Sequence, residues 1–407
     1  MPWRERSPMD QRMQFVTEYH SGLFTMTELA EQYAITRKTG YKWLARYDAE
    51  GVVGLLERSR RPHHSPQATE AALVDALVAQ RHRHPRWGAK KLLAVLARHQ
   101  PRAAWPSRAT VCTLLKQRGL ARPRRWRNRP PPGMPPRTPI TAVNEVWTTD
   151  FKGQFRTGDG VYCYPLTLRD GFSRFVLRCD ALLGPTYEAT RRRFEQAFAE
   201  YGLPQRLRSD NGAPFAGAGL ARLSRLNVWW MRLGIVPERI AVGHPEQNGS
   251  HEQFHRVLKA DTTRPPAATG RAQQRRFDTF CAEYNHERPH EALADQTPAM
   301  VYQPSPRVLP RRVPPLDYPG HFEIRRVYGN GCVWWGDRVV FVSNALIGED
   351  VGFEEVGEGL WTVYFATVAL ARFDERHRHL HPLAAVRAGR FASSAGSAPD
   401  LTQQRKR

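Results

Sequence analysis

The stretch Val146-Trp147-Thr148-Thr149-Asp150-Phe151 decides the fold of the central part of this chain. Its β-branched and aromatic residues are typical of a strand. Alternation along a strand places Asp150 on the same face as Val146 and Thr148. The stretch therefore predicts a carboxylate held near the end of a rigid strand, although a single Asp is more often a solvated turn residue.

Two further carboxylates occupy comparable positions later in the sequence. Residues 206–209 form a short predicted strand that ends at Asp210, and the turn signal Asn211-Gly212 follows. Glu252 lies on a helix predicted over residues 246–262, where its spacing places it on one face with His255, Arg256 and Lys259.

Two-metal phosphoryl transfer needs a few carboxylates on rigid elements, because hard divalent cations take oxygen ligands. Asp150, Asp210 and Glu252 fit this need as catalytic metal ligands. The residues alone leave rivals open, namely Asp170, Asp180, Asp261 and Glu283. Glu246, if helical, lies about 120° from Glu252 around the helix axis and is a poor substitute.

The surrounding segments predict a mixed sheet covered by helices on both faces, because strands come first and then alternate with helices. The predicted strands are residues 146–155, 161–168, 175–179 and 206–209, and the predicted helices are 186–201, 220–233, 246–262 and 277–284.

The charge of the chain points to a polyanionic partner. The 407 residues carry a formal net charge of +22, which favours nucleic acid. Residues 76–144 contain 16 Lys or Arg and no Asp or Glu. A chain that is simply Arg-rich throughout is the alternative, but it does not explain why acidic residues return after Asn144.

Residues 24–47 predict a helix-turn-helix, with helices at 27–33 and 37–47 and Thr36 as the second N-cap. Trp43 and Leu44 face inward in this prediction. A plain amphipathic helical hairpin is the alternative. A recognition helix reads base edges near its N-terminal end, so the expected DNA contacts are Arg37, Lys38, Tyr41 and Lys42.

The rest of the chain divides by composition into further expected domains. A helix-turn-helix domain at 1–60 is followed by a second at 67–121, with helices at 88–99 and 107–118. A basic, Pro-rich linker at 122–140 carries Arg124, Arg125 and Arg127, which suit a DNA backbone unless the segment is a mere spacer. The catalytic core spans 141–305, short strands predict a small β-barrel at 321–380, and the basic tail 388–407 is expected to be disordered.

Several protein classes are excluded by what the sequence contains. No run of about 18 apolar residues predicts a membrane span, and no apolar segment near Met1 predicts a secretory signal. The five cysteines are scattered and never form a C-x-x-C pair. This spacing argues against a disulfide scaffold or a zinc finger and fits a reducing cytoplasm, where we expect a nucleoid-associated protein.

Several motifs, in order and spacing, resemble the insertion-sequence transposases of the DDE type, whose core is similar to retroviral integrases. The resemblance covers roughly residues 10–305, and its departures are a missing His/Cys zinc domain and a weak match in the C-terminal part. The matching segments are Trp147–Phe151, Ser209–Phe215, His244–Glu252, Phe254, His255, Lys259, Tyr284–Leu293, Thr297-Pro298, Lys38–Leu44 and Arg58–Pro62.

The resemblance implies an RNase H-like core in which Asp150, Asp210 and Glu252 hold two Mg²⁺, with Mn²⁺ as a substitute. It implies that water frees a 3′-OH at each end of a mobile element and that this hydroxyl then attacks target DNA. The implied partners are double-stranded DNA, from element ends and target, and further copies of the chain. We add Asn248 and Lys259 to the expected DNA contacts.

Two other functional classes remain as alternatives. A catalytically silent, domesticated DNA-binding regulator would share the fold but has no need of all three carboxylates. A basic structural protein of the nucleoid does not explain the carboxylate motifs.

Overall fold

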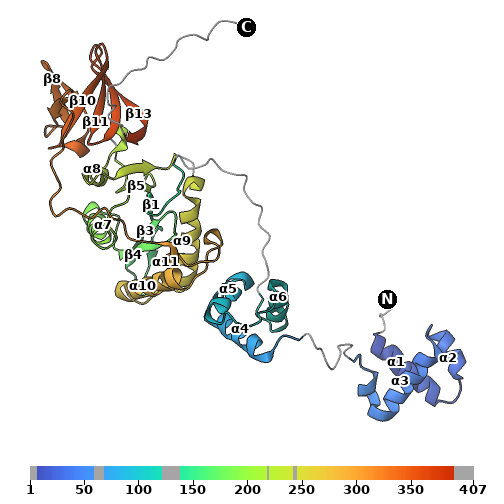
Figure 1. Ribbon diagram of the computed structural model, residues 1–407. Helices are drawn as coiled ribbons and strands as arrows, with labels where there is room; N and C mark the ends of the chain where they lie inside the picture. The colour runs from blue at the N-terminus through green and yellow to red at the C-terminus, as the bar shows by residue number, and fades with distance from the viewer. Residues whose placement is uncertain (1–6, 59–67, 122–137, 218–219, 242–244, 389–407) are drawn as a thin grey trace, which may run out of the picture. The chain divides into compact units, whose positions relative to one another are not determined.

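The computed structural model describes residues 7–58, 68–121, 138–217, 220–241 and 245–388. The chain divides into two compact units, residues 1–70 and 71–407 (Figure 1). In the described residues, no helix combines the length and apolar character that a membrane crossing requires.

The first unit is a small helical domain around Phe15, Leu29 and Trp43. Its helices are α1 (Pro8–His20), α2 (Met26–Gln32), α3 (Arg37–Glu50) and the 3₁₀ helix η1 (Gly51–Leu55). Thr36 caps α3 by accepting a hydrogen bond from the Thr39 N–H, as predicted. The structure thus confirms the two helices of the predicted motif and adds α1, which the sequence pattern did not predict.

The second unit begins with three helices packed around Leu92 and Val111. They are α4 (Ala71–Arg83), α5 (Ala89–His99) and α6 (Arg108–Gln117). Ser107 caps α6 by accepting from the Thr110 N–H. The helices predicted at 88–99 and 107–118 are therefore present. The linker arginines Arg124, Arg125 and Arg127 and the tail beyond residue 388 lie outside the described residues.

The central sheet has the order β2-β3-β1-β5-β6, with β4 paired to β3. Strand β1 runs antiparallel to β3 but parallel to β5, and β5 runs parallel to β6. The sheet is therefore mixed, as predicted. Its strands are β1 (Val146–Phe151), β2 (Phe155–Arg156), β3 (Tyr162–Asp170), β4 (Val176–Leu182), β5 (Arg206–Ser209) and β6 (Val236–Arg239).

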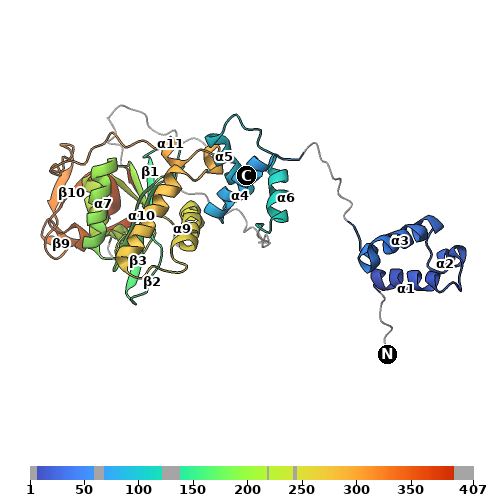
Figure 2. The ribbon, with the colours of Figure 1, turned by 90° about the horizontal axis from the view of Figure 1, so that it is seen from below.

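Helices cover both faces of this sheet (Figure 2). One face packs through Trp147 and Leu207 against α7 (Tyr187–Tyr201) and α8 (Arg225–Arg232). The other packs through Cys163 and Val176 against α9 (Gly249–Thr262) and α10 (Gly270–His286). Three short helices complete this region, namely η2 (Leu220–Arg222), η4 (Glu291–Leu293) and α11 (Pro298–Val301).

Several predicted elements of the core have different bounds in the structure. The helix predicted over 277–284 is α10, which begins at Gly270 and ends at His286. The strand predicted over 146–155 is split, because Gly153 takes a left-handed φ of 68° between β1 and β2. The helix predicted from 246 begins at Gly249, after the 3₁₀ helix η3 (Pro245–Asn248). The helix predicted over 220–233 is interrupted before Ser224, which caps α8.

The C-terminal strands do not form the predicted closed barrel. Among the described residues they form an open five-stranded sheet, in the order β13-β12-β11-β10-β7, and a separate hairpin of β8 and β9. Alternation predicts the face of each residue but not whether the two edge strands meet. The strands are β7 (Glu323–Arg326), β8 (Cys332–Trp335), β9 (Arg338–Phe341), β10 (Asp350–Gly357), β11 (Leu360–Phe365), β12 (Val368–Asp374) and β13 (His379–Ala388), and the 3₁₀ helix η5 (Asn344–Leu346) lies between β9 and β10.

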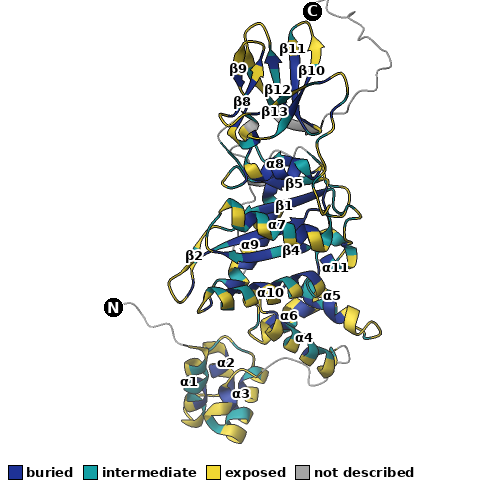
Figure 3. Ribbon diagram, turned by 90° about the vertical axis from the view of Figure 1, so that its left-hand side faces the viewer, coloured by how far each residue is buried: buried dark blue, intermediate teal, exposed yellow. Residues whose placement is uncertain are grey.

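This C-terminal sheet shares its core with the region of the central sheet. Val228 and Met231 of α8 and Val236 of β6 belong to the same buried apolar cluster as Phe353 and Val363 of the sheet. Figure 3 shows buried residues on α8 and on the strands of this sheet. The sheet therefore covers an apolar surface of the core that would otherwise face water.

Candidate active site

The pairing of β1 with β5 places Asp150 and Asp210 side by side. Thr148 pairs with Arg208 in this parallel ladder. Two residues further along each chain are Asp150 and Asp210, which therefore share one face at the carboxyl ends of adjacent strands. Helix α9 covers this face, since its His251 bonds Thr148 and its His255 lies beside Asp150.

Burial disfavours the charged form of both carboxylates, and the charge of Asp210 adds to this effect at Asp150. Burial, followed by the charge of Asp210, raises the pKa of Asp150 to about 7, and Glu252 adds a smaller contribution in the same direction. Burial also raises the pKa of Asp210, although the Gly212 N–H opposes this shift. The site thus holds more negative charge than its protein neighbours neutralise.

Asp210 has an oxygen that the described part of the chain does not satisfy. Its Oδ1 is buried and has no hydrogen-bond partner among the described residues. An unpaired buried carboxylate oxygen is costly unless a cation or another donor meets it. This oxygen and the charge of Asp150 fit a divalent cation, which prefers such ligands.

Glu252 has a more open position than the two aspartates. It is exposed in the first turn of α9, one turn before the buried His255. Within the described residues, no three His, Cys, Asp or Glu side chains form a closed group around an ion position. The structure therefore brings Asp150 and Asp210 together and leaves Glu252 at the border of the same site.

The rival carboxylates all have protein partners. Both Asp170 oxygens accept hydrogen bonds, from Asn144 N–H and from Ser173. Asp261 pairs with Arg86, and Glu283 bonds His84. The side chain of Glu246 lies outside the described residues.

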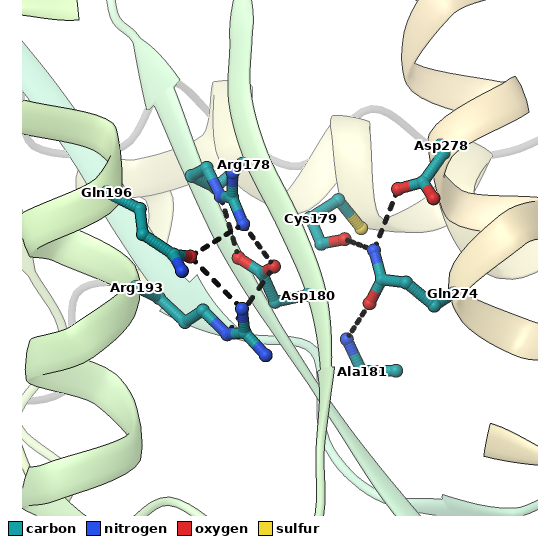
Figure 4. A network of polar contacts seen from close by, with 8 residues as sticks. All are labelled: Arg178, Cys179, Asp180, Ala181, Arg193, Gln196, Gln274 and Asp278. Carbon is teal, nitrogen blue, oxygen red and sulfur yellow. Dashed lines mark hydrogen bonds and ion pairs between the residues drawn. The ribbon is translucent and has the colours of Figure 1, made fainter. Parts of the chain in front are cut away.

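Asp180, the remaining rival, is paired with two arginines. It lies on β4 between Arg178 of the same strand and Arg193 of α7, at 2.8 and 3.7 Å (Figure 4). On the other side of β4, Gln274 of α10 bonds the main chain of Cys179 and Ala181. Asp180 thus has a structural role on the face opposite to Asp150.

Two buried histidines next to Asp150 were not predicted as site residues. His251 and His255 are 1% and 5% exposed, and both bond the Thr167 hydroxyl. His255 Nδ1 lies 3.6 Å from Asp150 Oδ2. Burial lowers the pKa of His255 to about 3, with help from Lys152 and Arg169, so this imidazole is neutral at pH 7. One feature of the sequence indicated that His255 belongs to the site, namely the helical spacing that places it on the same face as Glu252.

The predicted DNA contacts fall into two environments. Asn248 is buried at the start of α9, whereas Lys259 is exposed on this helix. In the first unit, the four residues of α3 that were predicted to contact DNA, namely Arg37, Lys38, Tyr41 and Lys42, are all exposed.

A basic cavity of about 560 Å³ lies beside α3. Its buried Trp43 ring is covered by Arg12, Lys42 and Arg46, at 3.9, 4.5 and 5.1 Å from the ring centre. Glu57 is the acidic residue in the cavity lining, and it pairs with Arg12. The cavity is therefore positively charged, as a surface for phosphates should be.

Comparison with known proteins covers more than half of the chain. A family model described as the leucine-zipper of insertion element IS481 matches residues 11–84. Two models described as integrase core domains match residues 140–245 and 233–298. A protein of insertion element IS476 from Xanthomonas euvesicatoria is 26% identical over 280 residues, which cover 68% of this chain and 77% of the relative.

Solved structures of retroviral integrases also match, with low scores. The HTLV-2 integrase catalytic core in complex with magnesium has 16% identity and a TM-score of 0.29, and the match covers 42% of this chain and all of that one. The simian T-cell lymphotropic virus intasome in complex with PP2A regulatory subunit B56 gamma has 16% identity and a TM-score of 0.35, over 77% of this chain and 98% of that one.

Because the TM-scores are under 0.5, these structures do not identify the family of the chain. The family models and the insertion-element relative do point to a family, and they agree with the order of the motifs along the chain. Together, these matches support an insertion-sequence transposase with an integrase-like core.

Proposed function

We propose that this transposase cleaves DNA at the ends of its element and joins the freed 3′-OH groups to target DNA, with Asp150, Asp210 and Glu252 as the metal-binding carboxylates. One observation carries the proposal. Asp150 and Asp210 lie at the ends of adjacent strands under α9, and burial together with the charge of Asp210 raises the pKa of Asp150 to about 7.

The donor set suits Mg²⁺, with Mn²⁺ as a substitute. Asp150 and Asp210 offer carboxylate oxygens, and these include the buried Oδ1 of Asp210, which has no hydrogen-bond partner among the described residues. Glu252 adds a third carboxylate from α9. When bound, two such ions supply charge neutralisation for the transferring phosphate and for its attacking and leaving oxygens.

The residues of the chain divide the remaining tasks. Strands β1 and β5 hold Asp150 and Asp210 rigidly, which is the requirement for positioning reacting groups. Lys259 is exposed two turns after Glu252, where its ammonium can bind a DNA phosphate. The surrounding fold keeps His255 neutral, so it adds no positive charge that would compete with a metal ion.

We assign recognition of the element ends to the first unit. Arg37, Lys38 and Tyr41 are exposed near the start of α3, and we expect them to contact base edges. The cavity lined by Lys42 and Arg46 suits the DNA backbone. Two element ends and one target require more than one active site, so the active form is an oligomer on DNA.

A strand-transfer assay tests this proposal. The full chain should convert DNA that carries the element's own ends into joined product, in the presence of Mg²⁺ or Mn²⁺. Asp150→Asn, Asp210→Asn and Glu252→Gln should each abolish cleavage and joining, because each removes a charge that the ions require, while DNA binding survives.

Asp180→Asn is the matched control, since Asp180 is a buried carboxylate of the same sheet with arginine partners. Any Asp180→Asn protein that folds should retain strand transfer. Substantial Mg²⁺-dependent activity in one of the three variants would remove that residue from the site. Specific DNA binding without product in the intact chain would instead indicate a silent regulator.

A further inference from the structure

We propose that the hydroxyl of Thr167 is a positioning group, which ties two histidines of α9 to the main chain of Asp150 and so sets Glu252 opposite that carboxylate. The catalytic consequence rests on the proposed function. The hydrogen-bond network itself does not, and it can be tested separately.

Three hydrogen bonds meet at this hydroxyl. Thr167 Oγ1 lies 2.9 Å from the carbonyl oxygen of Asp150, 2.7 Å from His251 Nε2 and 2.8 Å from His255 Nε2. Thr167 is fully buried on β3, and it pairs with Asp150 of β1 across the ladder. One hydroxyl therefore connects two strands of the sheet to the helix that covers them.

Counting hydrogens fixes the direction of each bond. A threonine hydroxyl carries one hydrogen and two lone pairs, and a carbonyl oxygen can only accept. The Thr167 hydrogen must therefore go to the Asp150 carbonyl. Both imidazoles must then donate from Nε2 to the Thr167 lone pairs, and the neutral His251 accepts at Nδ1 from the Thr148 hydroxyl, at 2.9 Å.

This network brackets Glu252 in the sequence. His251 precedes Glu252 directly, and His255 follows it by one helical turn. The start of α9 is held further by Arg169, which donates to the carbonyl of Ser250 at 3.0 Å, and by Arg174, which bonds the Ser250 hydroxyl. Within the part of the chain that the structure describes, no comparable contact restrains Glu252 on its exposed face. Its position relative to Asp150 is therefore set by its two histidine neighbours.

Conservative substitutions separate the hydroxyl from the shape of the residue. Thr167→Val keeps the branched side chain and removes the hydroxyl, whereas Thr167→Ser keeps the hydroxyl. Thr149→Val is the matched control, because Thr149 is equally buried and its hydroxyl bonds the carbonyl of Thr167 at 3.0 Å, outside the histidine network.

We expect Thr167→Val to lower the strand-transfer rate by about 10–100-fold and to raise the Mg²⁺ concentration for half-maximal activity, as loss of an outer support of a metal site does. In Thr167→Ser and in Thr149→Val, both the strand-transfer rate and the Mg²⁺ concentration for half-maximal activity should stay near the wild-type values. Equal losses in Thr167→Val and Thr149→Val would mean a merely structural role and would overturn the proposal.

Side-chain NMR of ¹⁵N-histidine protein tests the network without any catalysis. The chain has 15 histidines, so the two signals are assigned from His251→Gln and His255→Gln spectra. Both rings should be Nε2–H tautomers in the full chain and in Thr167→Ser. In Thr167→Val, the two rings should no longer both be in the Nε2–H form. A protonated Nδ1 on His255 in the neutral ring would contradict the proposal, even in a chain that shows no strand transfer.

Discussion

At Asp150, burial and a neighbouring carboxylate act in the same direction on one ionisable group. The folded-state pKa of about 7 lies well above the ordinary value near 3.9 for Asp. The folded protein therefore favours the protonated form. Stability from this group is complete below about pH 4 and is lost as the pH rises through 7.

Asp150→Asn should therefore stabilise the metal-free protein while it abolishes activity. At pH 8 we expect a gain of about 2–4 kcal/mol in the free energy of unfolding, since each pKa unit corresponds to about 1.4 kcal/mol. The gain should vanish near pH 4. Urea unfolding at both pH values, with EDTA present, measures this difference.

Added Mg²⁺ provides the second arm of the same experiment. An ion that binds only the folded state stabilises it by about 2.7 kcal/mol at a concentration 100 times its Kd. Wild-type protein should gain stability with Mg²⁺, and Asp150→Asn should not. Asp180→Asn should instead lose about 3 kcal/mol without metal, because Arg178 and Arg193 would lose a buried partner. A loss of stability at pH 8 in Asp150→Asn would contradict this account of the site.

The site residues show which features of a site can be predicted from the sequence. Strand alternation and the Asn211-Gly212 turn predicted Asp150 and Asp210 at strand ends, and helical spacing placed Glu252 near His255. The bonds of Thr167 to His251 and His255 span 84 and 88 residues. Local periodicity gives the face of each residue but not its partner on a distant element, so the network could not be predicted.

At the scale of single elements, α3 is the clearest case for a role in DNA recognition. At 100° per residue, Lys38, Tyr41 and Lys42 point away from the buried Gly40, Trp43 and Leu44. Arg37 and Arg46 flank the exposed face on opposite sides. Arg37 lies at the start of the helix, and Arg46 lies over Trp43 in the basic cavity.

Arg37→Ala should reduce discrimination between the element end and unrelated DNA by about 10–100-fold, which corresponds to about 1–3 kcal/mol for a base contact. Arg46→Ala should weaken binding to every sequence alike and reduce the slope of log affinity against log salt by about 0.9. Gel-shift titrations of the full chain at several salt concentrations measure both. An unchanged preference in Arg37→Ala would move base reading to another element.

Element types were predictable where a cap or a turn residue marks the boundary. Thr36 was predicted to cap α3 and does so in the structure, and Ser107, where the predicted helix 107–118 begins, caps α6. Strand β6 was missed, since four residues that include Pro237 read poorly as a strand. Pro237 is tolerated because β6 pairs only with β5 and forms the edge of the sheet.

For the whole molecule, the shared core of α8 and the C-terminal sheet is the main departure from expectation. Turn signals predicted the strands of this region but not what they pack against. Leu223, Val228 and Met231 join the buried cluster of the sheet, and nothing in their local pattern distinguishes this partner from the central sheet.

Truncation should therefore affect the two ends of the chain differently. Removal of residues beyond 320 uncovers Val228, Met231 and Val236, so the shortened chain should aggregate or lose its cooperative thermal transition. Removal of residues 1–70, a compact unit by itself, should leave the melting temperature of the remainder unchanged. That shorter protein should bind element ends no better than unrelated DNA. Retained end specificity would contradict the role given to the first unit.

The claim that Asp150, Asp210 and Glu252 form one metal site is tested most directly by locating Mn²⁺ in crystals through its anomalous scattering. Density should appear in contact with the carboxylates of Asp150 and Asp210, with Glu252 completing the coordination. This density should disappear in Asp210→Asn crystals. Density at other carboxylates alone, such as Asp261 or Glu283, or the same density in Asp210→Asn, would contradict the assignment of the site.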